Sequence, residues 1–156
     1  FSADDVVRQL YKKKSFKKLI LHKFNISNKS KIKTSLREKI LNNKKNLSKL
    51  ENIIHPLVRK EMRGFIAKNK KKLMFFEIPL LIESKLMKNF DKIIFIKAKK
   101  SIRLKRFKTK GGSEKLFKIL DKKQLKDVKK IKFCDYVIVN EKNLDILKKN
   151  LSDIVI

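Results

Sequence analysis

Hydrophobic side chains recur at helical spacing through the first half of the chain. Between Asp4 and about His22 they fall three to four residues apart, and an aspartate at the start of this pattern would cap a helix. A longer pattern of the same period runs from about residue 31 to residue 69. We expect breaks in it near Asn42–Asn43 and at Pro56, because proline suits the first turn of a helix and not its interior.

The second half alternates between two kinds of pattern. Near-continuous apolar runs occupy segments 72–83, 91–98 and 134–140, as is typical of strands buried on both faces of a parallel sheet. Each run is followed by a segment with helical spacing, at 80–87, 101–107 and 143–154. This alternation predicts βαβ units with right-handed crossovers. The fold class is therefore predicted to be α/β, a parallel sheet with helices on both faces.

A glycine pair, Gly111–Gly112, interrupts a further helical pattern between residues 103–110 and 114–120. A helix–glycine–helix hairpin rich in cations is what a mobile lid over a phosphate site would use. An ordinary surface hairpin fits the same composition equally well, so both interpretations stay open at this point.

The formal net charge of +29 raises the question of a nucleic-acid partner. Six of the 44 basic residues are arginine, so 38 are lysine, and the lysines are spread from residues 12–14 to residues 148–149. A nucleic-acid-binding face would more often concentrate its charge and use arginine for bidentate contacts. We therefore interpret the lysine excess as compositional. A basic nucleic-acid-binding protein remains the alternative, and weak, salt-sensitive attraction to polyanions is expected in either case.

Length and cysteine content narrow the class of protein further. A chain of 156 residues fits one domain with one core. Cys134 is the only cysteine, so no disulfide can form within the chain, and we expect a reducing compartment such as the cytoplasm. The sequence contains no run of about 18 apolar residues, so we expect no membrane span.

Candidate binding residues follow the predicted strands, because ligands of an open α/β sheet collect at the carboxyl ends of the strands. Glu83 lies on a short helix after the first apolar run, and Asn140 ends the last one. The segment HPLVR places Arg59 one helical turn from His55 and on the same face. Glu83 also has an ordinary interpretation as a solvated side chain, and the His-Pro pair of HPLVR as the start of a helix.

Five short segments, taken in order, resemble the dephospho-coenzyme A kinase family. They are SADDVVRQL at 2–10, HPLVR at 55–59, EIPLLIESKL at 77–86, RLKRFKTK at 103–110, and KILDKKQ at 118–124 followed by CDYVIVN at 134–140. Each segment alone is weak evidence, but their order and spacing agree with the family over essentially the whole chain.

The resemblance implies a P-loop kinase with a three-layer α/β/α fold. The implied reaction transfers the γ-phosphoryl group of ATP to the ribose 3′-hydroxyl of dephospho-coenzyme A, which is the last step of coenzyme A biosynthesis. ATP and Mg²⁺ are the implied cofactors, with no specific nucleic acid and no membrane as partners. One domain over residues 1–156 would contain a helical acceptor-binding region at about 25–70 and a helical lid at about 103–124.

The resemblance also implies roles for particular side chains. The general base is Asp4; the acceptor-binding residues are Arg8, His55, Arg59 and Glu83; the nucleotide-binding and lid residues are Arg103, Arg106, Lys110 and Asn140. Helix packing is an alternative role for His55 and Arg59. Three positions depart from the family pattern: Ser2 replaces an aspartate, and Lys110 and Ile119 each replace an arginine.

The family pattern begins with a strand, a Gly-x-x-x-x-Gly-Lys-Ser/Thr loop, a helix and a second strand, and none of this opening unit is found in these 156 residues. No glycine occurs before Gly64. We therefore expect that the chain starts after the phosphate-binding loop and that these 156 residues by themselves are inactive. A degenerate kinase-like fold kept as an interaction module is the remaining alternative.

Overall fold

The computed structural model describes residues 1–27 and 31–155. The chain divides into two compact units, Phe1–Pro79 and Leu80–Ile156, and each is described by itself. The predicted helical region at about 25–70 falls in the first unit, and its residues 28–30 lie outside the described residues. The second unit contains the sheet.

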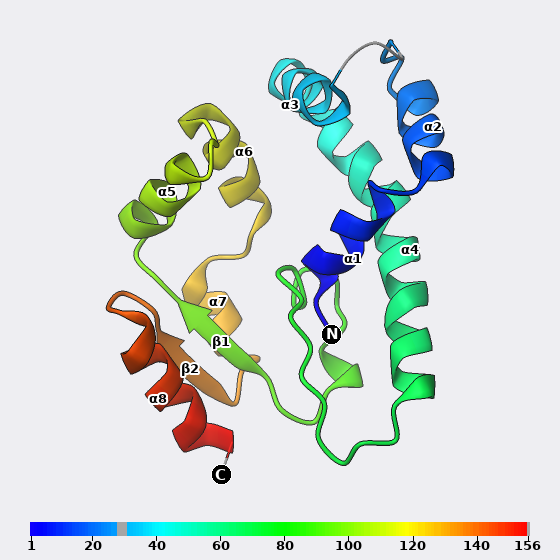
Figure 1. Cartoon of the computed structure of the whole chain (residues 1–156). Helices are drawn as coiled ribbons and strands as arrows, with labels where there is room; N and C mark the ends of the chain where they lie inside the picture. The colour runs from blue at the N-terminus through cyan, green and yellow to red at the C-terminus, as the bar shows by residue number, and fades with distance from the viewer. Residues whose placement is uncertain (28–30, 156) are drawn as a thin grey trace. The chain divides into compact units, whose positions relative to one another are not determined.

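The first unit is built from helices (Figure 1). They are α1 (Ala3–Leu10), α2 (Lys14–Lys23), α3 (Ile32–Asn42) and α4 (Lys45–Lys68). Their apolar faces meet in one buried cluster: Leu10, Phe16, Ile20, Phe24, Ile26 and Leu36. Ile20 is completely buried at its centre. The helical periodicity of the sequence is confirmed here, because the apolar stripes of the helices face this common core.

The helical pattern between Asp4 and His22 forms two helices where one was predicted. Tyr11 ends α1, and the backbone N–H groups of Lys12 and Lys13 bond back to the carbonyl groups of Gln9 and Leu10. The turn brings the rings of Tyr11 and Phe16 into edge-to-face contact at 5.1 Å between centroids. A change of direction between the helices thus lets both contribute to the core.

The break between α3 and α4 is confirmed, whereas the break at Pro56 is wrong. Asn43 separates the helices, and its Oδ1 accepts a bond from the Lys45 N–H at 2.9 Å. Pro56 lies inside α4, which continues without interruption to Lys68. Four apolar side chains of α4 pack against the core: Leu50, Ile53, Ile54 and Leu57. Their burial offsets the one hydrogen bond that a proline removes from a helix.

The apolar run at 72–83 does not form the predicted strand within the described chain. Glu77 makes a single parallel bridge with Ser2: its N–H donates to the Phe1 carbonyl at 2.8 Å, and its carbonyl accepts from the Ala3 N–H at 3.0 Å. Leu73 is 60% exposed, so this run is not buried on two faces as its composition suggests. The predicted helix at 80–87 is also wrong, since the segment forms turns that lead into the short 3-10 helix η1 (Met87–Asn89).

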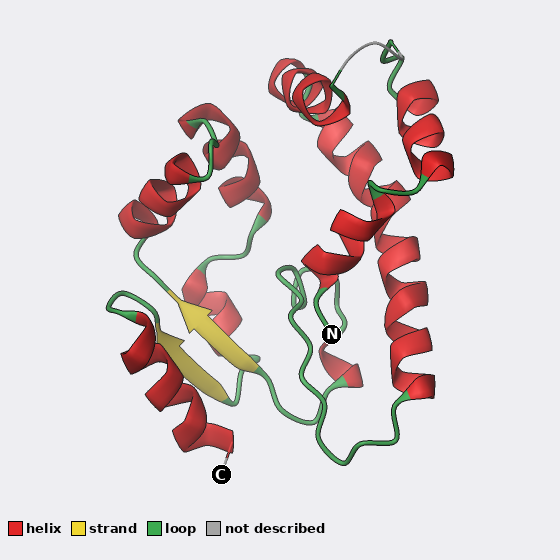
Figure 2. Cartoon of the chain, viewed as in Figure 1, coloured by secondary structure: helices red, strands yellow, loops and turns green. Residues whose placement is uncertain are grey.

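The second unit holds a parallel pair of strands, β1 (Ile94–Lys97) and β2 (Tyr136–Val139), in register from Ile94 beside Tyr136 to Lys97 beside Val139 (Figure 2). Helices α5 (Lys100–Thr109), α6 (Glu114–Lys123) and α7 (Asp127–Ile131) connect the two strands, and α8 (Leu144–Val155) follows β2. α7 packs against β1 and α8 against β2. The predicted α/β class with a parallel sheet is confirmed.

The longest helix, α4, has 24 residues, which would suffice in length to cross a bilayer. Its sequence is interrupted by charged side chains throughout. Among the helices of residues 1–27 and 31–155, none combines the length and the apolar character that a membrane span needs.

Candidate nucleotide site

A cavity of about 270 Å³ opens at the carboxyl end of β1. Its lining contains Lys97, Ala98, Lys99, Lys100, Arg103, Asp121, Gln124, Leu125, Lys126 and Asp127. Basic side chains outnumber the two carboxylates, so the cavity favours an anionic ligand. It also adjoins the first turn of α5, which has no side-chain cap and whose backbone N–H groups and helix dipole attract phosphate.

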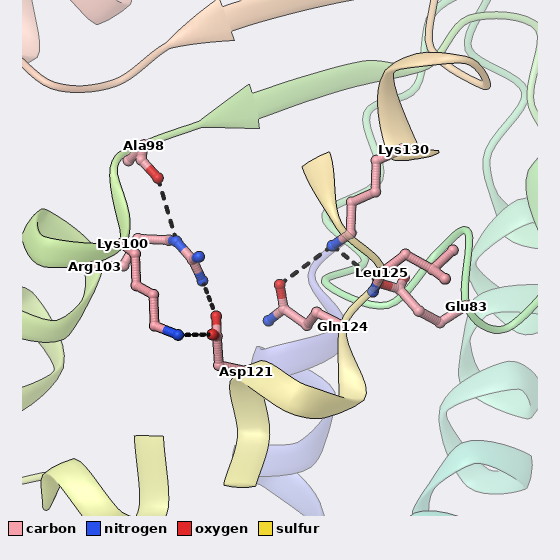
Figure 3. Close-up of polar contacts among 8 residues, drawn as sticks. All are labelled: Glu83, Ala98, Lys100, Arg103, Asp121, Gln124, Leu125 and Lys130. Atoms are coloured by element: carbon pink, nitrogen blue, oxygen red, sulfur yellow. Dashed lines mark hydrogen bonds and ion pairs between the residues drawn. The ribbon is translucent and has the colours of Figure 1, made fainter. Parts of the chain in front are cut away.

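Arg103 is held in place at this cavity by the opposite arm of the hairpin (Figure 3). One guanidinium nitrogen donates to Asp121 Oδ1 at 2.8 Å, and Nε donates to the Ala98 carbonyl at 3.3 Å. Lys100 Nζ lies 2.8 Å from the other oxygen of Asp121. The hydrogen bond from Lys100, followed by that from Arg103, holds the pKa of Asp121 below its ordinary value. An ionised Asp121 therefore fixes two cations of the cavity wall.

Arg106 and Asn140, predicted to contact the nucleotide, contact each other. The Arg106 guanidinium donates to the Asn140 backbone carbonyl at 3.0 Å and to its Oδ1 at 3.4 Å. This pair ties α5 to the residue that follows β2. Lys110 is exposed at the C-terminal end of α5 and is not part of the cavity lining.

The helix–glycine–helix hairpin that the sequence predicts is present. Gly111 adopts a positive φ of 78°, which glycine tolerates and which lets α5 end and the chain reverse. A Cβ at Gly112 would clash with the Phe107 ring, which itself packs on Phe117 at 5.8 Å between centroids. The hairpin is thus closed by ring packing as well as by the link from Arg103 to Asp121. Its role as a lid stays a prediction.

Glu83 takes part in an internal network. Its Oε1 accepts from the Leu125 N–H at 2.9 Å and lies 2.9 Å from Lys130 Nζ (Figure 3). Lys130 in turn donates to Gln124 Oε1 at 3.2 Å. Sequence reasoning missed Lys130, because one lysine among 38 carries no signal that it is buried.

Apart from Glu83, the acceptor-side candidates lie in the first unit on two helices that pack together, α1 and α4. Asp4 is exposed in the first turn of α1, where the Ser2 hydroxyl caps the helix by accepting from the Asp5 N–H at 3.3 Å. Arg8 forms an ion pair with Asp5 one turn away. On α4, His55 is half-buried and Arg59 is exposed.

A second cavity, of about 220 Å³, lies in this unit beside Arg8. Its walls are mainly apolar, with cations among them: Val7, Arg8, Tyr11, Lys33, Leu36, Arg37, Ile40 and Leu50. Burial raises the pKa of the Tyr11 phenol, and Lys33 Nζ lies 5.5 Å from the centre of its ring. The cavity can therefore accommodate a ligand with both an apolar and an anionic part.

Parallel strands, connecting helices and a cationic cavity at the end of β1 define an α/β protein whose strand ends carry a cavity suited to an anionic ligand. Comparison with known sequences gives the particular family. The sequence model of CoaE, dephospho-CoA kinase, matches residues 3–145. The chain belongs to the dephospho-CoA kinase family.

Individual relatives agree with this assignment. A dephospho-CoA kinase of Bartonella quintana (strain Toulouse) is 37% identical over 151 residues, which cover 93% of this chain and 77% of that protein. One from Fusobacterium nucleatum is 34% identical, with 96% of this chain and 80% of that protein covered. The crystal structure of TT1252 from Thermus thermophilus superposes with a TM-score of 0.73 at 19% sequence identity. The alignment covers 99% of this chain and 82% of the TT1252 chain, which shows that the two share a fold.

The family membership confirms several predictions made from the sequence. The enzyme class, a kinase of coenzyme A biosynthesis, is the one predicted. Use of a nucleotide follows from membership in a kinase family. The roles of individual side chains stay predictions.

Proposed function

We propose that this protein transfers the γ-phosphoryl group of ATP to the ribose 3′-hydroxyl of dephospho-coenzyme A. The 3′-oxygen forms a bond to the γ-phosphorus while the bond from that phosphorus to the β–γ bridging oxygen breaks, so coenzyme A and ADP are the products. The match of residues 3–145 to the family carries the proposal. The cationic cavity at the end of β1 supports it, because phosphoryl transfer depends on positioning and on cations around the phosphates.

On the nucleotide side, Arg103 is the residue best supported for phosphate binding. It lines the cavity, and the bond to Asp121 fixes its guanidinium, so little side-chain entropy would be lost when phosphate binds. Arg106 and Lys110 would add charge from the hairpin. Asn140 would lie beside the adenine ring.

On the acceptor side, Asp4 would take the proton of the 3′-hydroxyl, since its carboxylate is exposed at the start of α1. Arg8, His55 and Arg59 would bind the acceptor and its phosphates from α1 and α4. Glu83 is also predicted to bind the acceptor. Its bonds to Leu125 and Lys130 support a positioning role instead.

Mg²⁺ is proposed to arrive with ATP as part of the substrate complex. Across residues 1–27 and 31–155, no three His, Cys, Asp or Glu side chains gather into a metal-binding group. Mg²⁺ usually takes one or two carboxylates together with substrate phosphates and water, and does not depend on a dedicated cage of protein ligands.

Formation of coenzyme A from dephospho-coenzyme A tests the proposal. Because the 156 residues contain no Gly-x-x-x-x-Gly-Lys sequence, two proteins are compared: this chain alone, and this chain with the phosphate-binding strand, loop and helix of a relative joined before Phe1. We expect product from the fusion only, with ³¹P NMR placing the new phosphate on the 3′-oxygen. A well-folded fusion that forms no coenzyme A would contradict the proposal. Activity of the chain alone would place its phosphate site elsewhere.

A further inference from the structure

Lys130 is a buried cation that the proposed reaction does not use. It is 5% exposed, the only charged residue buried among those described. Its ammonium lies 2.9 Å from Glu83 Oε1, 3.2 Å from Gln124 Oε1 and 5.7 Å from the centre of the Phe95 ring. A buried ammonium group is costly unless it is paired and hydrogen-bonded, and these neighbours supply both kinds of contact.

The ammonium group determines which way the Gln124 amide faces. A lysine ammonium can only donate, so the Gln124 atom beside it has to be the carbonyl oxygen. The NH₂ group must then point away from Lys130. Figure 3 shows the Gln124 amide nitrogen away from Lys130 and on the side of Asp121, which lines the same cavity as Gln124. The chemistry of lysine therefore fixes the orientation of the Gln124 amide.

Glu83 stabilises this arrangement in two ways. Its carboxylate compensates the charge of Lys130, with which it shares a buried environment: the two side chains are 14% and 7% exposed. The same carboxylate accepts the Leu125 N–H at 2.9 Å, which anchors the backbone directly after Gln124. Both the side chain of Gln124 and the chain that carries it are thus held by one buried pair.

We propose that Gln124 donates its amide NH₂ to a hydrogen-bond acceptor of the nucleotide in the β1 cavity, and that Lys130 is the positioning residue that holds this orientation. The proposal rests on the proposed function, which places a nucleotide in that cavity. The lysine side chains around the cavity attract negative charge from any direction, and the Arg103 guanidinium already donates to Asp121 and Ala98, whereas the Gln124 amide offers directed donors to a ligand. The acceptor belongs either to the adenosine part or to the phosphates, and the two are tested separately.

The chain offers an internal control, because its sequence contains only two glutamines, Gln9 and Gln124. Glutamine labelled with ¹⁵N in the side chain gives one NH₂ signal pair for each. Gln9 is exposed on α1 and reports non-specific effects. Without ligand, we expect the Gln124 NH₂ group to be more restricted in motion than that of Gln9. Equal mobility of the two side chains would overturn the proposal.

Two probes then separate the sources of the acceptor: adenosine, and inorganic triphosphate at physiological salt, which weakens general attraction to a chain of charge +29. We expect one of them to shift the Gln124 signals and leave those of Gln9 unchanged. If neither probe moves Gln124 at millimolar concentration, or if both glutamines move together, the proposal is wrong.

Variants test the role of Lys130 without leaving a buried charge unpaired. In the double variant that combines Glu83→Gln with Lys130→Met, the Gln124 amide should become as mobile as that of Gln9. The probe that shifts Gln124 in the wild type, called the effective probe, should bind this variant about three- to tenfold more weakly. Lys130→Arg keeps a donor and should retain most of the restriction. Gln124→Glu keeps an oxygen for Lys130 but loses the NH₂ group. If adenosine is the effective probe, this variant should bind it about tenfold more weakly. Unchanged mobility and affinity in the double variant would overturn the positioning role.

The outcome can be separated from that of the proposed reaction. If coenzyme A formation fails while adenosine or triphosphate still shifts Gln124, the proposed function is wrong and the binding role of Gln124 stands. If coenzyme A forms while the Gln124 signals stay silent toward both probes, the inference is wrong and the proposed function stands.

Discussion

The guanidinium of Arg103 donates to Asp121 Oδ1 at 2.8 Å and thereby joins α5 to α6 across the hairpin. Arg103 also lies 5.8 Å from the centre of the Phe117 ring, measured from its guanidinium carbon. The same contact fixes a cation of the cavity and closes the hairpin. The position of Arg103 in the cavity and the stability of the hairpin therefore both depend on the Asp121 carboxylate.

That link predicts a loss of stability in acid. The pKa of Asp121 is lowered in the folded state, first by Lys100 and then by Arg103. The ionised carboxylate therefore stabilises the fold above the ordinary aspartate pKa of about 3.9, and this stabilisation is lost as the pH falls through the lower pKa of the folded state. Urea unfolding of the wild type between pH 6 and pH 2 should show this loss, and Asp121→Asn should show a smaller acid dependence. Asp91→Asn, at an exposed loop position, is the matched control. Identical acid profiles for wild type and Asp121→Asn would contradict the expectation.

The buried pair of Glu83 and Lys130 predicts strong non-additivity. Lys130→Met alone should lower the free energy of unfolding by about 3–5 kcal/mol, because it leaves the Glu83 carboxylate buried without its cation. Adding Glu83→Gln should recover much of the loss, since the double variant buries no charge. A double-mutant cycle in urea measures this coupling. If the two losses simply add, the carboxylate is not held by this lysine.

Three glycines predict three different responses to alanine. Gly112→Ala should destabilise the hairpin by about 1–3 kcal/mol, because its Cβ would displace the Phe107 ring from Phe117. Gly111→Ala should cost about 1 kcal/mol or more through its positive φ. Gly64→Ala, inside α4 with open space around it, should stabilise the protein by about 0.5–1 kcal/mol. Thermal unfolding distinguishes them, and destabilisation by Gly64→Ala would contradict the packing described for α4.

The elements predicted correctly are those whose own pattern decides their structure. The apolar stripes of α3 and α4 and the four-residue strands β1 and β2 follow directly from periodicity and from short apolar runs. The run at 72–83 is as apolar as the run that contains β1, but a strand depends on its neighbours, and within the described part of the chain this run forms only the bridge from Ser2 to Glu77. Tertiary packing also determines the outcome at Pro56, where burial of the α4 face outweighs the local preference.

The candidate site was predictable in position and less so in its contacts. The rule that ligands gather at the ends of parallel strands points to the β1 cavity, and the family resemblance points to Arg103, which lines it. It does not show that Arg106 binds Asn140, because that contact joins side chains 34 positions apart. Lys130 and Asp121 escaped notice for the same reason: their importance lies in which residues they face, and no spacing in the sequence encodes it.

The dispersed lysines predict weak and unspecific binding of nucleic acid. Binding of a mixed-sequence DNA duplex should weaken steeply as salt is raised from 50 to 200 mM, since the attraction comes from release of counterions. Fluorescence anisotropy at several salt concentrations measures the slope, and a second duplex of unrelated sequence is the control. A nanomolar, sequence-selective complex at physiological salt would contradict the compositional interpretation of the charge.

The role proposed for Asp4 predicts a loss of turnover without a loss of nucleotide affinity. In the fusion protein that carries a phosphate-binding loop, Asp4→Asn should lower kcat by about 10²–10⁴-fold, the usual contribution of a general base. The asparagine keeps the size of the side chain but cannot accept the proton of the 3′-hydroxyl. Affinity for ATP should change little, because the cavity at the end of β1 is formed by residues 97–127 and does not include α1.

Asp5→Asn is the matched control for this experiment. Asp5 is the next residue of α1, also exposed and in its first turn, and its carboxylate pairs with Arg8. Loss of that pair should raise the KM for dephospho-coenzyme A if Arg8 binds the acceptor, with kcat nearly unchanged. Wild-type turnover in Asp4→Asn would remove this carboxylate from the reaction, and an equal fall of kcat in both variants would show that α1 matters only as a structural element.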